Sequence, residues 1–288
     1  LSTIAGWTRG SKDAPELTIN KLRLRSIKVA TPVETPKFDL EVSLGPRGEL
    51  RTAIFNVEKA RIEVTPKDKS WSIKMSASGW KPMIGPAVEF DELEASGIIT
   101  GDNALLDSIK GRVCGGTFSA KLKASWDGAM QASGDLKLEN GKLLLLMPAF
   151  TSNFSALGTL NLTATYALSG SEIKSFLDST RLDGTFTVAG GELNNMDIVR
   201  ALQSARAGGQ RGGKTRFDTL SGTVNVEGKR YSFRQLQLNS GPMNASGAVD
   251  INDGALNGRI NAELGTKGVV VARGALAATG TLRDPVLR

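Results

Sequence analysis

Residues 116–138 read GTFSAKLKASWDGAMQASGDLKL, and this stretch decides the fold. Apolar residues occupy every second position of its first half: Phe118, Ala120, Leu122, Ala124 and Trp126. Asp127-Gly128 is a dipeptide typical of hairpin turns, and the alternation resumes after it up to Leu138. Because successive side chains of a strand point to opposite faces, the stretch predicts an antiparallel hairpin with one apolar face and one polar face.

Alternating runs of the same kind recur on both sides of this hairpin. They cover residues 38–44, 71–77, 160–168, 217–226, 231–238, 243–251, 256–264 and 270–280. Helical patterns occupy 104–109, 171–179 and 196–207, the last with Asn195 as its expected N-cap. We predict a mainly β protein with roughly twelve to sixteen strands and about two or three short helices. The strands are expected to form a long curved antiparallel β-sheet, either a β-groove or a jelly-roll-like meander.

The chain of 288 residues is long enough for one large β unit or two ordinary domains. We expect a β-rich N-terminal segment, 1–110, and a C-terminal segment, 111–288, that together form one elongated β unit. Within the second segment, Asn140-Gly141 predicts another turn. The longest apolar run, Leu143 to Met147, is far shorter than the roughly 20 residues of a membrane helix. Because the chain starts at Leu1 without Met, we expect an excised fragment in which any signal or anchor lies upstream.

Composition narrows the chemistry that is open to the chain. Histidine is absent and Cys114 is the one cysteine, whereas the usual hydrolase triad, most zinc and iron sites and an intrachain disulfide need those residues. The net charge of +7 reflects 36 Lys and Arg against 29 Asp and Glu, but no basic block is interleaved with aromatic side chains as in nucleic-acid binders. We therefore predict no catalytic residue, metal, cofactor or nucleic-acid partner, and a role that is not enzymatic.

A glycine-rich stretch, residues 208–215, reads GGQRGGKT and matches the phosphate-loop pattern G-x-x-x-x-G-K-[ST]. That loop binds phosphate only between a buried strand and a helix that begins at its lysine. Here a helical pattern precedes the loop and a strand-like run follows it, so we interpret the stretch as a flexible basic connection. Its cations Arg211, Lys214 and Arg216 are candidates for contacts with lipid head groups.

One acidic cluster, residues 90–94 (FDELE), brings three carboxylates together. Two carboxyl groups can serve as the acid and the base of a glycosidase-like site. No second acidic cluster stands out as a partner, so a solvated strand edge is the simpler interpretation.

Many strands and few helices raise the question of what covers the apolar face. Pattern alone favours a closed core, in which the sheet folds onto itself. Small residues at many positions of that face, such as Gly134, Gly247 and Gly258, favour instead an open apolar surface beside the backbone. The candidate lining residues of such a surface are large and apolar: Phe118, Leu122, Trp126, Leu160, Leu162, Leu236 and Leu238.

Short motifs follow one another in a fixed order along the last third of the chain. They read LDGTF at 182–186, GELNNMDI at 191–198, TRFDTLSG at 215–222 and GTLRDP at 280–285, with VCGGTF at 113–118, LGT at 157–159 and GWKP at 79–82 upstream. In order and spacing they resemble the C-terminal region of the AsmA family of bacterial envelope proteins. The resemblance covers the chain from Lys110 onward. The family supplies no catalytic residues, and the glycine-rich loop has no counterpart in it.

This resemblance implies a periplasmic protein that an upstream helix holds to the inner membrane. AsmA-like proteins are similar to bridge-like lipid-transfer proteins, in which a long curved sheet forms an apolar groove. The partners it implies are phospholipid or another acyl lipid, and envelope proteins. We therefore expect a segment that binds or conducts lipid and supports outer-membrane lipid homeostasis. The alternative is a structural β-domain of the envelope with a closed core and no ligand.

Overall fold

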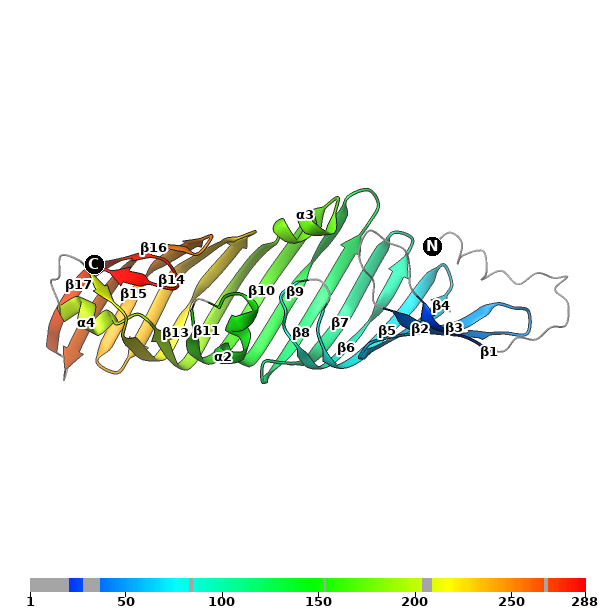
Figure 1. Ribbon diagram of the computed structural model, residues 1–288, viewed down its shortest axis with the longest axis horizontal. Helices are drawn as coiled ribbons and strands as arrows, with labels where there is room; N and C mark the ends of the chain where they lie inside the picture. The colour runs from blue at the N-terminus through cyan, green and yellow to red at the C-terminus, as the bar shows by residue number, and fades with distance from the viewer. Residues whose placement is uncertain (1–20, 28–36, 83–84, 153, 204–208, 267–268) are drawn as a thin grey trace.

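The computed structural model describes residues 21–27, 37–82, 85–152, 154–203, 209–266 and 269–288. They form one antiparallel sheet of 18 strands, whose strands lie side by side along the length of an elongated molecule (Figure 1). Neighbours in the sheet are neighbours in the chain from β1 to β11 and from β13 to β18. The prediction of a mainly β protein built on a long antiparallel sheet is confirmed.

The strands have the following bounds. They are β1 (Lys21–Ile27), β2 (Phe38–Leu44), β3 (Leu50–Val57), β4 (Ala60–Lys67), β5 (Ser70–Trp80), β6 (Phe90–Thr100), β7 (Asn103–Val113), β8 (Gly116–Ser125), β9 (Met130–Lys142), β10 (Ala156–Gly170), β11 (Arg181–Asn194), β12 (Gln210–Arg211), β13 (Lys214–Glu227), β14 (Arg230–Ser240), β15 (Met243–Asn252), β16 (Ala255–Thr266), β17 (Val269–Gly280) and β18 (Pro285–Leu287). The helices are α2 (Leu143–Leu146), α3 (Ile173–Asp178) and α4 (Ile198–Gln203), with a 3₁₀ turn η1 (Met147–Ala149). Strand β7 crosses the expected boundary at residue 110 and pairs with neighbours on both sides.

Three local predictions were wrong, two of them because of β-bulges. Residues 104–109 are part of β7, where a bulge between Leu106 and Ile109 places both on one face and so imitates helical spacing. Asn140-Gly141 is a bulge inside β9, where Asn140 adopts φ 59°. The N-cap of α4 is Asp197, whose Oδ1 accepts a hydrogen bond from the N–H of Arg200 at 2.9 Å, and it is not Asn195.

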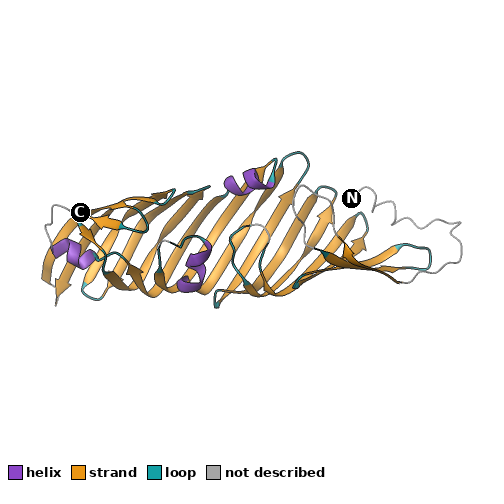
Figure 2. Cartoon of the chain, viewed as in Figure 1, coloured by secondary structure: helices purple, strands orange, loops and turns teal. Residues whose placement is uncertain are grey.

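Tight turns join most strands. At Asp253-Gly254 both residues have positive φ, 49° and 80°, as a two-residue hairpin turn requires. The longer connections carry the helices, and two of these lie on one long side of the sheet, where β9 and β11 end and β10 and β13 begin (Figure 2). We call this the α2 side. It carries α2 and α4, whereas α3 lies on the opposite long side.

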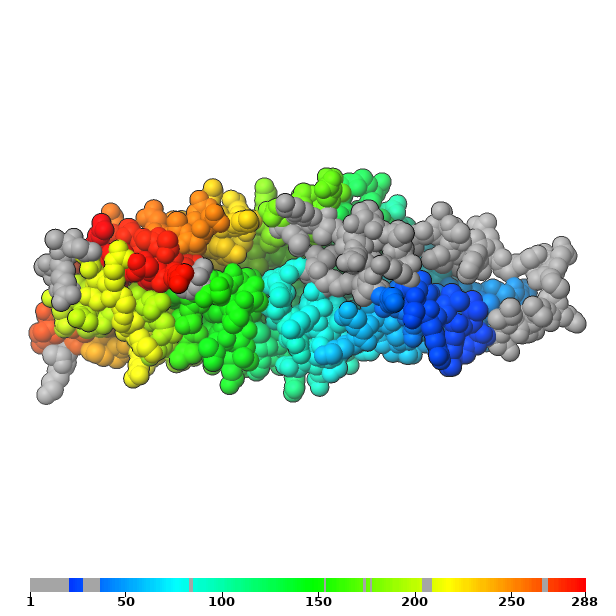
Figure 3. All heavy atoms as spheres, in the orientation of Figure 1, coloured from blue at the N-terminus to red at the C-terminus, as the bar shows by residue number. Residues whose placement is uncertain are grey.

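The sheet rolls back on itself at its C-terminal end. The short strand β12 pairs with β18, although it lies only two residues before β13 in the chain. Helix α4 packs against β13, β16 and β17, and its Ile198 and Ala201 are buried. The atoms of the C-terminal residues and of this helix form one continuous surface over that end (Figure 3).

The main hydrophobic core therefore lies in the C-terminal half. Its largest fully buried side chain is Met243, and it includes Val188, Phe217, Ile260 and Leu276. In β2 to β6, by contrast, the buried apolar residues are mostly small: Val42, Ala53, Ala60, Leu93 and Ala95. The sheet is thus closed at one end, and its apolar face is less deeply covered toward the other.

We expect Met243→Ala to lower the free energy of unfolding by about 2–5 kcal/mol, because the truncation leaves a cavity in this core. Met243 is 1% exposed, whereas Leu144 is 57% exposed, so Leu144→Ala is the matched control and should change stability little. Denaturant unfolding followed by circular dichroism measures both. Equal effects of the two substitutions would contradict the position of the core.

Candidate functional site

One row of apolar residues and glycines crosses every strand of the sheet except β12. Each member is the cross-strand partner of the next, with one residue from each of strands β1 to β11 and β13 to β18. In order, they are Leu24, Leu40, Phe55, Ile62, Met75, Ala95, Ile109, Ala120, Leu136, Ala164, Gly184, Val224, Phe233, Val249, Gly258, Ala278 and Leu287. We call this the central row. No polar side chain interrupts it.

Parallel rows flank the central row on the same face. On the α2 side, the register links Phe38, Val57, Ala60, Ala77, Leu93, Gly111, Phe118, Leu138, Leu162 and Phe186. On the other side it links Leu22, Val42, Ala53, Val64, Ile73, Gly97, Leu106 and Leu122. The rows together make a continuous apolar face at least three residues deep across β2 to β8.

The opposite face is polar over the same strands. One of its rows, again read from the register, consists of Asp39, Asn56, Arg61, Ser76, Glu94, Lys110, Ser119, Lys137 and Thr163. Most of its members are exposed. The sheet is therefore two-sided, with water on one face and apolar side chains on the other.

Burial of the apolar face differs between its two ends. In the C-terminal half Ala278 is fully buried and Ala262 nearly so, under α4 and the strands that roll back. Over β3 to β9 the larger members of the central row, such as Ile62, Met75 and Ile109, are only half-buried. A half-buried apolar row on an unclosed part of a sheet is the kind of surface that can accept an apolar ligand.

The predicted lining residues separate into two groups. Phe118, Leu122, Trp126, Leu162 and Leu236 are half-buried, and the Phe118 ring makes an edge contact with Phe90 at 5.4 Å between centroids. Leu160 and Leu238 are 7% and 5% exposed and belong to the closed core. Sequence alternation alone does not separate these groups, because it does not show which segments pack over a strand.

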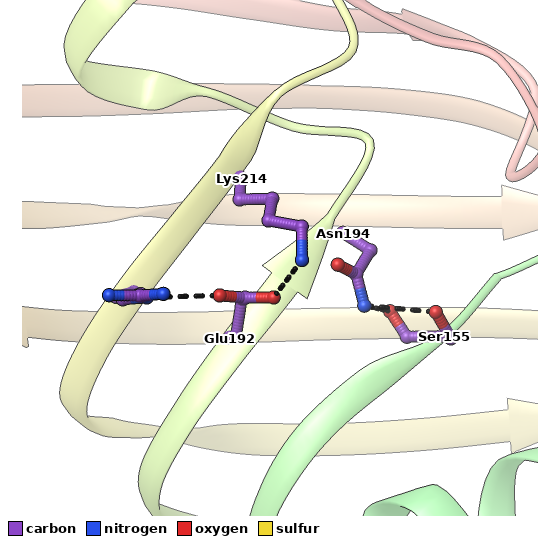
Figure 4. A network of polar contacts seen from close by, with 5 residues as sticks. Ser155, Glu192, Asn194 and Lys214 are labelled. Carbon is purple, nitrogen blue, oxygen red and sulfur yellow. Dashed lines mark hydrogen bonds and ion pairs between the residues drawn. The ribbon is translucent and has the colours of Figure 1, made fainter.

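The predicted head-group cations all have acidic partners. Lys214 Nζ lies 2.7 Å from Glu192 Oε1, and Arg216 Nε lies 3.0 Å from Glu192 Oε2 (Figure 4). Arg211 pairs with Asp284. The side chains of Lys214 and Arg216 remain 62% and 86% exposed, so the two cations share one carboxylate and still face water.

Hydrogen bonds from Lys214 and Arg216, with desolvation opposing them, hold the pKa of Glu192 below its ordinary value. The carboxylate is therefore ionised at neutral pH, and the cluster of these three residues carries one net positive charge.

Thr215 anchors α4 to the start of β13. Its Oγ1 donates a hydrogen bond to the carbonyl of Met196 at 2.7 Å and accepts one from the N–H of Ile198 at 3.0 Å. Thr215 is 3% exposed. Asp197, which caps the same helix, lies close to Gly213, where φ is 84°. The glycine-rich loop thus leads directly to the contacts that hold α4 in place, a role that its sequence did not indicate.

The phosphate-loop spelling does not form a phosphate loop. Gly212 and Gly213 both have positive φ, and a strand, not a helix, begins at Lys214. The residue Gly208 lies outside the described residues. Without a helix N-terminus at the lysine, the backbone N–H groups have no arrangement that would surround a phosphate.

The acidic cluster of β6 lies on a solvated strand. Asp91, Glu92 and Glu94 are exposed, and Glu92 pairs with Arg112 at 3.7 Å. Of two hollows, of about 710 Å³ and 380 Å³, only the smaller one touches this cluster. Glu94 lines it together with Glu63 and the cations Arg61, Lys74 and Lys110, and neither Asp91 nor Glu92 reaches it. Within the described residues, no group of His, Cys, Asp and Glu could hold a metal ion. Nor does that part of the chain contain a helix long and apolar enough to cross a membrane.

Comparison of the chain with known proteins returned no match among protein families, curated proteins or solved structures.

We expect Glu192→Gln to be less stable than the native chain at neutral pH, because two cations lose their carboxylate. The folded pKa of Glu192 is lowered, so its contribution is present above the unfolded pKa of about 4.3 and is lost as the pH falls through the folded value. The stability difference between the two proteins should therefore shrink in acid. Unfolding midpoints measured from pH 7 to pH 3 test this, and a difference that stays constant over that range would contradict it.

We expect Thr215→Val to loosen α4, because it removes one buried and one part-buried hydrogen bond and leaves the Ile198 N–H without this acceptor. The expected loss of stability is about 1–3 kcal/mol. Hydrogen exchange should become faster at the amides of α4, while the strands β2 to β6 keep their native protection. A uniform increase along the chain would show that Thr215 does not hold this helix specifically.

Proposed function

We propose that this protein binds acyl lipid on its apolar face, as an envelope lipid-binding or lipid-conduit segment. The observation that carries the proposal is the unbroken central row together with its flanking rows. A row that crosses the strands offers a straight apolar path along the length of the molecule, with neighbouring strands about 4.8 Å apart. An acyl chain can lie at any point along this path, because its binding requires no polar contact.

Simple energetics support an acyl chain as the ligand. Each CH₂ group removed from water contributes about 0.8 kcal/mol, so ten of them contribute roughly 8 kcal/mol before the losses of motion on binding are subtracted. The half-buried residues of β3 to β9, including Phe55, Met75 and Leu136, supply the apolar surface for this contact. The head group would stay in water beside the sheet.

The resemblance to the AsmA family supports the same proposal and adds a setting to it. It suggests a periplasmic location, an upstream anchor in the inner membrane, phospholipid as the ligand and a part in outer-membrane lipid homeostasis. The open antiparallel sheet is compatible with that resemblance. The proposals about the lipid species, the membrane anchor and the periplasmic location rest on the sequence motifs.

A second candidate function is a structural β-domain whose apolar face is filled by the chain itself. The hydrophobic core of the C-terminal half favours it, because Leu160, Leu238 and Met243 are buried there among side chains of the chain itself. If the same covering extended over β3 to β9, no acyl chain would fit. The two proposals therefore differ in what contacts the central row in its N-terminal half.

A charge or a large ring in the middle of the central row should prevent lipid binding. Ala120 lies between Ile109 and Leu136, and we expect Ala120→Glu and Ala120→Trp to reduce bound lipid at least about tenfold, the first by desolvation and the second by volume. The neighbouring Ser119 lies on the polar face between Lys110 and Lys137, so Ser119→Glu is the matched control. Lipid that copurifies is measured by native mass spectrometry, and uptake is followed with a fluorescent phospholipid.

The control variant should retain native lipid binding, and circular dichroism should show folded protein in all variants. A native protein that carries no lipid and takes up no fluorescent phospholipid would rule out the lipid proposal and leave the structural one. Unchanged binding in both Ala120 variants would place the lipid elsewhere on the molecule.

A further inference from the structure

Four large apolar side chains are exposed within residues 144–157, around the connection between β9 and β10 on the α2 side. Leu144 and Leu145 of α2 are 57% and 56% exposed, Phe150 after η1 is 52% exposed, and Leu157 at the start of β10 is 40% exposed. We call these four residues the rim patch. Helix α2 packs against β9 and β10, so the patch borders the apolar face of the sheet (Figure 1).

Folding alone does not account for the rim patch. Of the four consecutive leucines of α2, Leu143 and Leu146 pack against the hydrophobic core, as the i, i+3 spacing allows. A helix on a protein surface normally carries polar residues at the positions between them. Here those positions are Leu144 and Leu145, which face water instead.

A second exposed apolar segment lies on the same long side. Strand β17 begins there, and its first residues, Val269, Val270 and Val271, are 65%, 46% and 62% exposed. Among the described residues, seven of the eleven exposed large hydrophobic side chains therefore belong to the α2 side, four in the rim patch and three in β17. The others lie on β1 or form the pair Ile98 and Leu105 on the polar face.

Exposed cations flank the rim patch. In the register, Leu157 pairs with Glu192, and Glu192 pairs with Arg216, so Arg216 lies two strands from the patch, about 10 Å. Arg216 and Lys214 share the single carboxylate of Glu192, so the three residues together carry one net positive charge. Lys142, which directly precedes α2, is also exposed. Apolar tips beside cations are typical of segments that lie in the interface of an anionic lipid layer.

We propose that the α2 side is a membrane-docking surface, in which the rim patch enters the interface of a lipid layer that contains anionic lipid. Lys214 and Arg216 then face the head groups, and Val269–Val271 makes a second contact farther along. This inference rests on the proposed function in one respect: docking by this side would bring the lipid layer to the border of the apolar face. An anionic lipid layer is the proposed occupant because Lys214 and Arg216 stay 62% and 86% exposed beside the apolar side chains and can face anionic head groups.

Vesicle binding tests the proposal directly. The native chain is floated with vesicles of phosphatidylcholine alone and with vesicles that also contain phosphatidylglycerol, at low and high salt. We expect binding to the anionic vesicles that weakens with salt. Leu144→Ser combined with Leu145→Ser should weaken it about tenfold or more, since both side chains lose their place in the lipid. Lys214→Gln with Arg216→Gln should weaken binding to anionic vesicles and leave the other vesicles unaffected.

A matched control replaces apolar residues that are exposed elsewhere. Ile98→Thr with Leu105→Thr removes a pair that is 36% and 45% exposed on the polar face, and it should leave vesicle binding unchanged. Native vesicle binding by the Leu144 and Leu145 variant would overturn the proposal, as would equal losses in the control. Binding by the native chain to neither type of vesicle would overturn it too.

Uptake of a fluorescent fatty acid from vesicle-free solution separates this inference from the proposed function. The rim-patch variant should take up the fatty acid as the native chain does but extract fluorescent phospholipid from anionic vesicles about tenfold more slowly. If the native chain takes up fatty acid and phospholipid, and the rim-patch variant extracts phospholipid equally fast, the docking proposal is wrong and the proposed lipid-binding face stands. If it floats with vesicles through the rim patch yet takes up no lipid, the docking surface stands and the proposed function is wrong.

Discussion

The register of the antiparallel pairs is the constraint on which the rest of the structure depends. Each strand has its own alternation of apolar and polar residues, but only the hydrogen-bonded pairing decides which apolar residues meet across strands. A slip of one residue in a single strand would turn its apolar side chains toward water and break the central row. The row nevertheless runs from Leu24 to Leu287 without a polar side chain, so every pairing between them keeps the same phase. Where the chain has an even number of residues between two inward positions, a bulge restores that phase, as between Leu106 and Ile109.

Glycines in the rows make the close approach of neighbouring strands possible. A Cβ at Gly134 would collide with the carbonyl oxygen of Lys121, and one at Gly97 would collide with that of Leu105. Gly97 lies at a register shift between β6 and β7, whereas β8 and β9 pair on both sides of Gly134 without a shift. The same small residues leave the apolar face with little side-chain volume of its own. Burial of this face therefore requires another segment packed over it. At the C-terminal end, α4, β12 and β18 are those segments.

This division of the apolar face connects the fold with the two proposals. The closed end provides stability through Met243, Phe217 and Ile260, which need no ligand. The less covered strands β3 to β9 carry the surface on which lipid binding is proposed. Between these parts lie α2 and the Glu192 cluster, on the long side where apolar tips and cations are exposed together. The hydrophobic core, the proposed binding face and the proposed docking surface thus lie in different parts of one sheet.

The sequence alone determined the mainly β character of the chain, the two-sided strands and most of the hairpin turns. Those features are local, because alternation and turn dipeptides act within a few residues. It also indicated that the phosphate-loop spelling is not a nucleotide site, since a strand-like run follows Lys214. It misassigned residues 104–109, because a bulge within a strand gives the same i, i+3 spacing as a helix.

Only the tertiary structure decided which inward residues are enclosed. Phe118 and Leu160 have the same alternating environment in sequence, yet one is half-buried and the other lies in the core. Helix α2 contacts the strand of Leu160, and its Leu143 and Leu146 pack against the same core. The alternation within a strand carries no information about that contact. The same holds for the charges: Lys214 and Arg216 meet Glu192 only because β11 and β13 pair directly, with α4 and β12 looped out between them. Contacts of that kind depend on how the strands are ordered in the sheet, and this order is fixed by packing and pairing over the whole chain.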